Sequence, residues 1–310
     1  MVIKLAGTLG SLALLLAPSS AVTRPAAEPD ATPIIQTTDV DRFYAVYDAA
    51  GGSPTADRLQ HDYLDPGSEG LHTFAKARNI TGASIADTLA KHPAIYTDAR
   101  RCAVVLPHVR VRLQSALHRL ADLYPQARFP PVTIAVGRGK PVAIGGPGDG
   151  VMIGLEALCG VQYFDANVED RFVHVISHEY IHVQQSPSLT DDGHPSVLKI
   201  SLIEGIAEFM GEMISDGIGN PAVRGEAKGH ELAIETAFVA DEDKTDLSNW
   251  VFNGTLDKPG DLGYWVGYRI VKSYYQRAAD KRQAIRDIIE MTDPKAFLAK
   301  SGWHPGMDLE

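Results

Sequence analysis

The stretch His178-Glu179-Tyr180-Ile181-His182 carries the strongest structural and chemical signal in the chain. Residues four apart lie one above the other on an α-helix, so both imidazoles can reach one metal ion about 2 Å away. Apolar residues recur with helical spacing from Phe172, on a face that excludes both histidines. Glu179 lies near the histidines, where its carboxylate can accept a proton from an activated water. The stretch predicts a helix with a core side and a metal-binding side.

A second predicted helix, residues 197–215, supplies further carboxylates in Glu204-Gly205-Ile206-Ala207-Glu208. Charged residues usually mark a solvated helix face. Here the polar residues form one narrow stripe on a helix that is otherwise apolar, which predicts a mostly buried helix. A narrow polar stripe on a buried helix needs a partner, and a zinc ion with two histidines would satisfy it. We expect Glu204 to be the third metal ligand and Glu208 to hydrogen-bond a histidine ring.

These two motifs together resemble the gluzincin superfamily, which includes thermolysin-like and aminopeptidase-type zinc enzymes. The resemblance implies that Glu204 ligates zinc and that Glu208 orients a histidine. More narrowly, the sequence from Arg138 through H-E-Y-I-H-V-Q-Q to G-Y-W-V-G-Y-R at residues 263–269 resembles a bacterial family of predicted zinc-dependent proteases, related to gliding-motility lipoproteins. The chain departs from those lipoproteins because no Cys follows its N-terminal apolar run.

The resemblance also suggests residues for substrate binding and transition-state stabilisation. Residues 151–155 would form an edge strand that pairs with an extended substrate, or else plain sheet core. Tyr264 and Tyr268 lie four apart on one helical face, and either could donate a hydrogen bond to an oxyanion or simply pack in the core. Gly263 and Gly267 would permit close approach of another helix. His174, one turn before His178, reads as a structural polar residue.

The remaining sequence predicts an α+β fold that is mostly helical. Residues 39–128 read as a helical N-terminal region, and residues 129–310 as a zincin-like metallohydrolase domain. A small sheet is expected before the metal-binding helix, with strands at residues 132–136 and 151–155 and a flexible glycine-rich hairpin between them. A further helix is expected at residues 263–277.

The N-terminus has the pattern of a secretory signal. Lys4 precedes an apolar run from Leu5 to Ala17, followed by the small-residue site Ser19-Ser20-Ala21. The apolar run is short for a bilayer span, and no Cys follows it to carry a lipid. We expect residues 1–21 to be a signal peptide, residues 22–38 a linker, and the mature protein to be periplasmic or secreted without a membrane anchor.

The net charge bears on the kind of partner, and the cysteines bear on a possible disulfide. The formal net charge of -10 and the lack of a Lys/Arg cluster argue against a nucleic-acid partner. Cys102 and Cys159 are the two cysteines of the chain, and in an oxidising compartment they can form one disulfide. Two small buried side chains are the alternative.

Three functions fit these motifs. In the first, a zinc-dependent metallopeptidase hydrolyses a peptide or protein substrate by a zinc-activated water, with Glu179 as general base. The second is a non-catalytic envelope protein with a structural or vestigial metal site, which would leave Glu179 without a role. The third is a zinc hydrolase of a non-peptide bond, because three ligands and an open position serve several hydrolyses. These motifs do not indicate the oligomeric state.

Overall fold

The computed structural model describes residues 34–140, 142–147, 150–161, 165–190, 193–218, 220–254 and 260–309. The expected signal peptide and most of the expected linker lie outside these residues. Ile35 and Gln36 already form strand β1 (Ile35–Gln36) and pair with the sheet, so the linker ends earlier than residue 38. Within the described part of the chain, no helix is long and apolar enough to cross a membrane.

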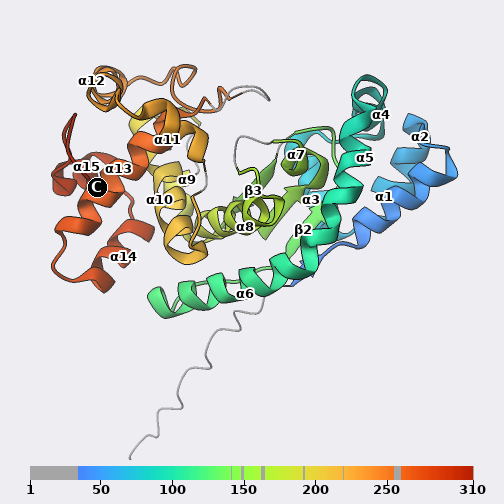
Figure 1. Cartoon of the computed structure of the whole chain (residues 1–310), viewed down its shortest axis with the longest axis horizontal. Helices are drawn as coiled ribbons and strands as arrows, with labels where there is room; N and C mark the ends of the chain where they lie inside the picture. Colours follow the sequence, from blue (N-terminus) through green and yellow to red (C-terminus); the bar gives the residue numbers. More distant parts are fainter. Residues whose placement is uncertain are drawn as a thin grey trace, which may run out of the picture.

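Helices dominate the fold, and four short strands form one sheet (Figure 1), which confirms the predicted mostly helical α+β class. In chain order the helices are α1 (Thr38–Ala49), α2 (Ala56–Arg58), η1 (Leu59–Leu64), α3 (Glu69–Arg78), α4 (Gly82–Lys91), α5 (Pro93–Cys102), η2 (Ala103–Val105), α6 (Leu106–Leu123), α7 (Leu155–Gly160), α8 (Val168–Gln184), α9 (Pro187–Thr190), α10 (Val197–Ser215), α11 (Pro221–Ala227), α12 (Glu231–Asp241), α13 (Leu262–Arg277), α14 (Lys281–Ile289) and α15 (Pro294–Ser301). Besides β1, the strands are β2 (Val132–Ala135), β3 (Ala143–Gly146) and β4 (Gly150–Gly154).

The sheet corrects two expectations. Its order is β1-β2-β4-β3, with β2 and β4 parallel and β3 antiparallel to β4. The glycine-rich segment therefore contains an edge strand, β3, and is not a simple hairpin between β2 and β4. Residues 151–154 belong to an inner strand, so the prediction that residues 151–155 form the edge is wrong and the sheet-core alternative holds for β4. Strand β3 was not predicted because it contains glycines, and glycine has low strand propensity.

Helix α8 is the central element of the fold (Figure 1), since it packs against β3 and β4 and also against α6 and α10. Its start is fixed by Asn167, whose side-chain oxygen accepts the backbone N–H groups of Glu169 and Asp170. Those two carboxylates also favour the positive end of the helix dipole. The predicted core face is confirmed, but the metal-binding face is buried as well, because α10 covers it.

Helices α10 and α13 cross in direct backbone contact. A Cβ added at Gly267 would lie 1.7 Å from the carbonyl oxygen of Ser201, and one added at Gly205 would lie 2.1 Å from the carbonyl carbon of Gly267. A Cβ at Gly263 would lie 2.6 Å from the Ser201 hydroxyl oxygen. The predicted close helix approach at Gly263 and Gly267 is confirmed, and it brings the start of α13 beside Glu204.

Buried apolar side chains form two clusters. One joins α1 to α6, the sheet and the sheet-facing side of α8, and the other joins the end of α6 to α10, α13, α14 and α15. Both clusters contain residues from before and after residue 128, so the domain division at that position stays a prediction. Cys102 and Cys159 form a disulfide with an S–S distance of 2.01 Å, which ties the end of α5 to α7.

Candidate metal centre

Three side chains from α8 and α10 converge on one point. The Nε2 atoms of His178 and His182 lie 3.0 Å apart, and each lies 3.2 Å from Oε2 of Glu204. All three residues are buried, with at most 9% of each exposed. The structure thus brings together the two histidines and the glutamate that the sequence motifs predicted as ligands.

The spacing of these donor atoms fits a tetrahedral metal. Bonds of about 2.0–2.1 Å at tetrahedral angles place neighbouring donors about 3.3 Å apart, close to the three separations in this site. Two imidazole nitrogens and one carboxylate oxygen are a donor set typical of zinc, with one position left for a water or substrate. The residues present therefore fit a zinc ion.

Both histidine rings are held with Nε2 facing the convergence point. Nδ1 of His178 lies 3.1 Å from Oε1 of Glu208, as the resemblance implied. Nδ1 of His182 lies 2.9 Å from the side-chain oxygen of Gln185, whose amide nitrogen in turn donates to the carbonyl of Ile203 at 2.8 Å. Such outer hydrogen bonds place the proton on Nδ1 and leave Nε2 free to bind a metal.

The charges of the site are strongly coupled. Burial alone would raise the pKa of Glu204, but the neighbouring His182 and His178 rings hold that pKa at about 2. Burial opposes the charged form of His178, yet its hydrogen bonds with Glu204 and Glu208 raise its pKa well above the ordinary value. The carboxylates of Glu204 and Glu208 thus favour a positive charge at His178. A bound cation would supply this charge in place of a proton.

His174 forms a second, looser group with His178 and Glu208. Its Nε2 has no hydrogen-bond partner among the described residues and lies 3.8 Å from Oε2 of Glu208. Its Nδ1 lies 3.3 Å from the hydroxyl oxygen of Ser215. The closest contact of this group is the one between His178 and Glu208, which already orients the first set of donors. His178, His182 and Glu204 are therefore the better candidate group for holding a metal.

The donor atoms open into a cavity of about 620 Å³. Glu179 also lines this cavity, is only 9% exposed, and is not one of the three convergent donors. Burial raises the pKa of its carboxyl group, and the nearby His182 and His178 oppose that rise. A buried carboxylate beside a metal position is suited to accept and return a proton.

Strand β3 passes directly over Glu179. A Cβ added at Gly145 would lie 2.5 Å from the backbone oxygen of Glu179 and 2.9 Å from its Oε2. Only a glycine fits this close approach. All four residues of β3 line the cavity beside this carboxylate.

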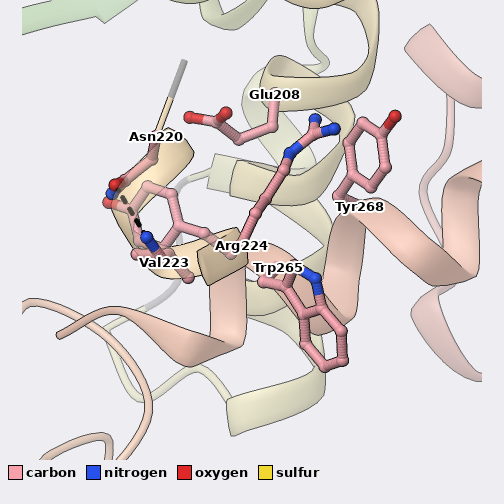
Figure 2. A pocket seen from close by; sticks show the side chains of 7 residues that line it. Glu208, Asn220, Val223, Arg224, Trp265 and Tyr268 are labelled. Atoms are coloured by element: carbon pink, nitrogen blue, oxygen red, sulfur yellow. Dashed lines mark hydrogen bonds between the residues drawn. The ribbon is translucent and has the colours of Figure 1, made fainter. Parts of the chain in front are cut away.

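The two candidate tyrosines have different surroundings. The Tyr264 ring stacks on the ring of His178, with centroids 6.3 Å apart, and it lines the cavity. Burial raises the pKa of Tyr264 well above the ordinary value, so its hydroxyl stays protonated. Tyr268 does not line this cavity, and Figure 2 shows Arg224 between its ring and Glu208, with the guanidinium 4.3 Å from the ring centroid. Tyr264 is thus the tyrosine of this pair that lines the cavity, and a catalytic part for Tyr268 stays a prediction.

The sequence motifs did not predict several residues that line the cavity. Arg78, at the end of α3, brings a guanidinium that makes no hydrogen bond or ion pair with another described residue. Asn220, Phe252 and Asp261 line the cavity from the C-terminal part of the chain. None of these four has a recognisable sequence signal. Gln185 lies directly after the metal helix, three residues past His182, where its spacing could have identified it.

Comparison with known proteins gives one match. Residues 245–305 match the family model of the gliding motility protein GldB. The matched stretch contains Phe252, Tyr264 and the whole of α13 and α14, and it includes no part of α8 or α10. No curated protein and no solved structure matches the chain. The match suggests an envelope-associated protein, and the relationship it supports is one to gliding-motility lipoproteins, through the C-terminal part of the chain.

Proposed function

We propose that the chain is an exported zinc-dependent peptidase. The position of Glu179 is the observation that carries this proposal, because its buried carboxylate opens into the same cavity as the three donor atoms without being one of them. A structural metal site needs no such group and is usually closed by four protein ligands. Hydrolysis needs both an open metal position and a neighbouring base.

Each residue then has a defined part in the reaction. His178, His182 and Glu204 would hold zinc, which would supply Lewis acidity toward a carbonyl and lower the pKa of water. Glu179 accepts a proton from the attacking water and returns it to the leaving amine. The protonated Tyr264 hydroxyl donates a hydrogen bond to the oxyanion that develops on the former carbonyl oxygen.

The edge strand supports a peptide as the substrate. The outer side of β3 carries no partner strand among the described residues, and the residues of β3 line the cavity. An extended peptide can pair with such an edge through its main-chain N–H and C=O groups. A substrate without a peptide backbone would make no use of these groups, so the edge favours peptide hydrolysis over the hydrolysis of another bond.

A non-catalytic envelope protein with a structural metal is the second candidate, and the match to a gliding motility family favours it. Under this function the donor atoms would hold a metal only to join α8 to α10. The two candidates differ over Glu179, which the second leaves without a role.

Export to the periplasm or the medium is supported by two features. The apolar run from Leu5 to Ala17 has the pattern of a secretory signal. The disulfide between Cys102 and Cys159 is typical of an oxidising compartment.

Metal analysis and digestion of a mixed peptide library by the mature chain test the proposed function. We expect one zinc per chain, and cleavage that a chelator abolishes and added zinc restores. His182→Ala should lose both properties, whereas His118→Ala, which removes an exposed histidine of α6, should keep both. Zinc binding without cleavage of any peptide would favour the envelope-protein candidate, and absence of zinc after reconstitution would contradict both.

A further inference from the structure

Phe252 has an unusual backbone conformation at the edge of the cavity. Its φ is +57°, in the left-handed region that side-chain-bearing residues adopt only at an energetic cost. The other described non-glycine residues with positive φ are Asn79, Asp216 and Asp261. Asn and Asp are the types that enter this region most readily. Phe252 is the exception, so the fold holds a bulky aromatic residue in a strained conformation.

The surrounding backbone keeps Phe252 in place. The N–H of Asn253 donates to Oδ1 of Asp261 at 3.1 Å, and the N–H of Asp261 donates to Oδ1 of Asn253 at 2.7 Å. The side-chain nitrogen of Asn253 donates to the carbonyl of Ser248 at 2.9 Å. These bonds fix the chain next to Phe252, and strain that the surroundings impose in this way is concentrated at functional sites in proteins.

The Phe252 ring contributes little to the packing of the fold. The residue is 65% exposed, so its side chain contributes little to either buried cluster. Its ring meets the edge of Tyr264, with centroids 6.5 Å apart and planes at 88°, and it lines the cavity. Ile200 and Ile203 line the same cavity from α10. Together these side chains present an apolar surface to the cavity that holds the metal position.

We propose that Phe252 is a substrate-binding residue, whose ring packs against an apolar side chain of a peptide lying between β3 and α13. This inference rests on the proposed peptidase function and names its substrate class, which is peptides with an apolar residue next to the bond that is cleaved. The strain at Phe252 is then the consequence of directing an aromatic ring into the cavity, because a residue with negative φ would place its side chain elsewhere.

Peptide binding to the zinc-loaded mature chain tests this role. Glu179→Gln serves as the background, so that bound peptide is not cleaved. The probes are two fluorescein-labelled pools of short peptides that differ at one central position, Leu or Phe in one pool and Ser or Asn in the other. We expect tighter binding of the apolar pool, and Phe252→Ala and Phe252→Gly should weaken it roughly tenfold. Phe252→Tyr and Val111→Ala, a control that is also 65% exposed but lies on α6, should not.

Thermal unfolding separates substrate binding from a structural role. Phe252→Gly removes the strain as well as the ring, so its melting temperature should rise by about 2–4 °C above that of Phe252→Ala. A fall in melting temperature in both variants, without a change in peptide binding, would make the ring structural and overturn the inference. Equal binding of both pools by every variant would also overturn it, although the peptidase proposal would stand if the wild type cleaves peptides. Absence of both binding and cleavage would contradict both proposals.

Discussion

The two walls of the cavity differ in how their polar and aromatic groups are partnered. The donor wall is formed by His178, His182 and Glu204, which are buried, and by Glu208, which is half-buried. Every side chain in it contacts another at 3.0 to 3.2 Å. The outer wall, formed by β3, Arg78 and Phe252, has an exposed ring, and its strand edge and guanidinium have no partner in the part of the chain that the structure describes. The donor wall is organised by its own contacts, whereas the groups of the outer wall remain available to a ligand.

The largest expected effect is on the donor wall. Glu204→Gln removes a charged donor atom, so zinc affinity should fall by more than roughly a thousandfold. Glu208→Gln keeps all three donors and removes only the carboxylate that orients His178, so affinity should fall by roughly 10–100-fold. Competition with a zinc indicator measures both affinities. Equal losses would show that Glu204 and Glu208 do not differ in this way.

The helix crossing behind the donor wall gives the next effect. Gly267→Ala places a Cβ 1.7 Å from the Ser201 carbonyl oxygen, so we expect a loss of about 2–3 kcal/mol in the free energy of unfolding, and weaker zinc binding as α10 shifts. Gly225→Ala is the matched control, because its Cβ meets nothing within 4 Å on α11. Denaturant unfolding compares the variants. Equal stability of both would mean that the crossing tolerates a side chain.

The paired tyrosines of α13 test which residue faces the reaction. Tyr264→Phe should lower kcat by roughly 10–100-fold, because it removes the hydrogen bond to the oxyanion. Tyr268→Phe should stay within about twofold of the wild type, since its ring lies under Arg224. The comparison uses initial rates on a peptide that the wild type cleaves. A larger loss for Tyr268→Phe would reverse the assignment.

The smallest expected effect is the release of protons when zinc binds. The raised pKa of His178 means that its ring carries a proton at pH 7 in the metal-free chain. Zinc binding should therefore release about one proton or more, and affinity should fall as the pH is lowered. Calorimetry in two buffers with different ionisation enthalpies measures the release. A binding enthalpy that does not depend on the buffer would mean that the donor wall is already deprotonated.

The donor wall was predictable because its signals are local. Two histidines four apart and a narrow polar stripe on residues 197–215 depend only on helical periodicity, and the structure brings His178, His182 and Glu204 together as expected. Helical periodicity shows which residues share a face of a helix, but it does not show which of them a side chain from another helix covers. The cover of the Tyr268 ring by Arg224, which comes from a separate helix, was therefore not visible in the sequence.

The outer wall was not predictable from the same patterns. β3 is a strand only because β4 pairs with it, and its glycines serve the close contact with Glu179. Arg78 reaches the cavity from a helix far away in the sequence, and the left-handed conformation of Phe252 is set by hydrogen bonds between Asn253 and Asp261. These features depend on contacts between distant segments, which no short pattern of residues encodes.

The proposed function depends on Glu179, because its carboxylate carries out the proton transfers of the reaction. Glu179→Gln keeps the size of the side chain and all three metal donors, so zinc content and melting temperature should match those of the wild type. The rate of peptide hydrolysis should fall by at least roughly a hundredfold, because the variant loses the carboxylate that accepts the proton. Retained zinc with hydrolysis at the wild-type rate would contradict the peptidase mechanism.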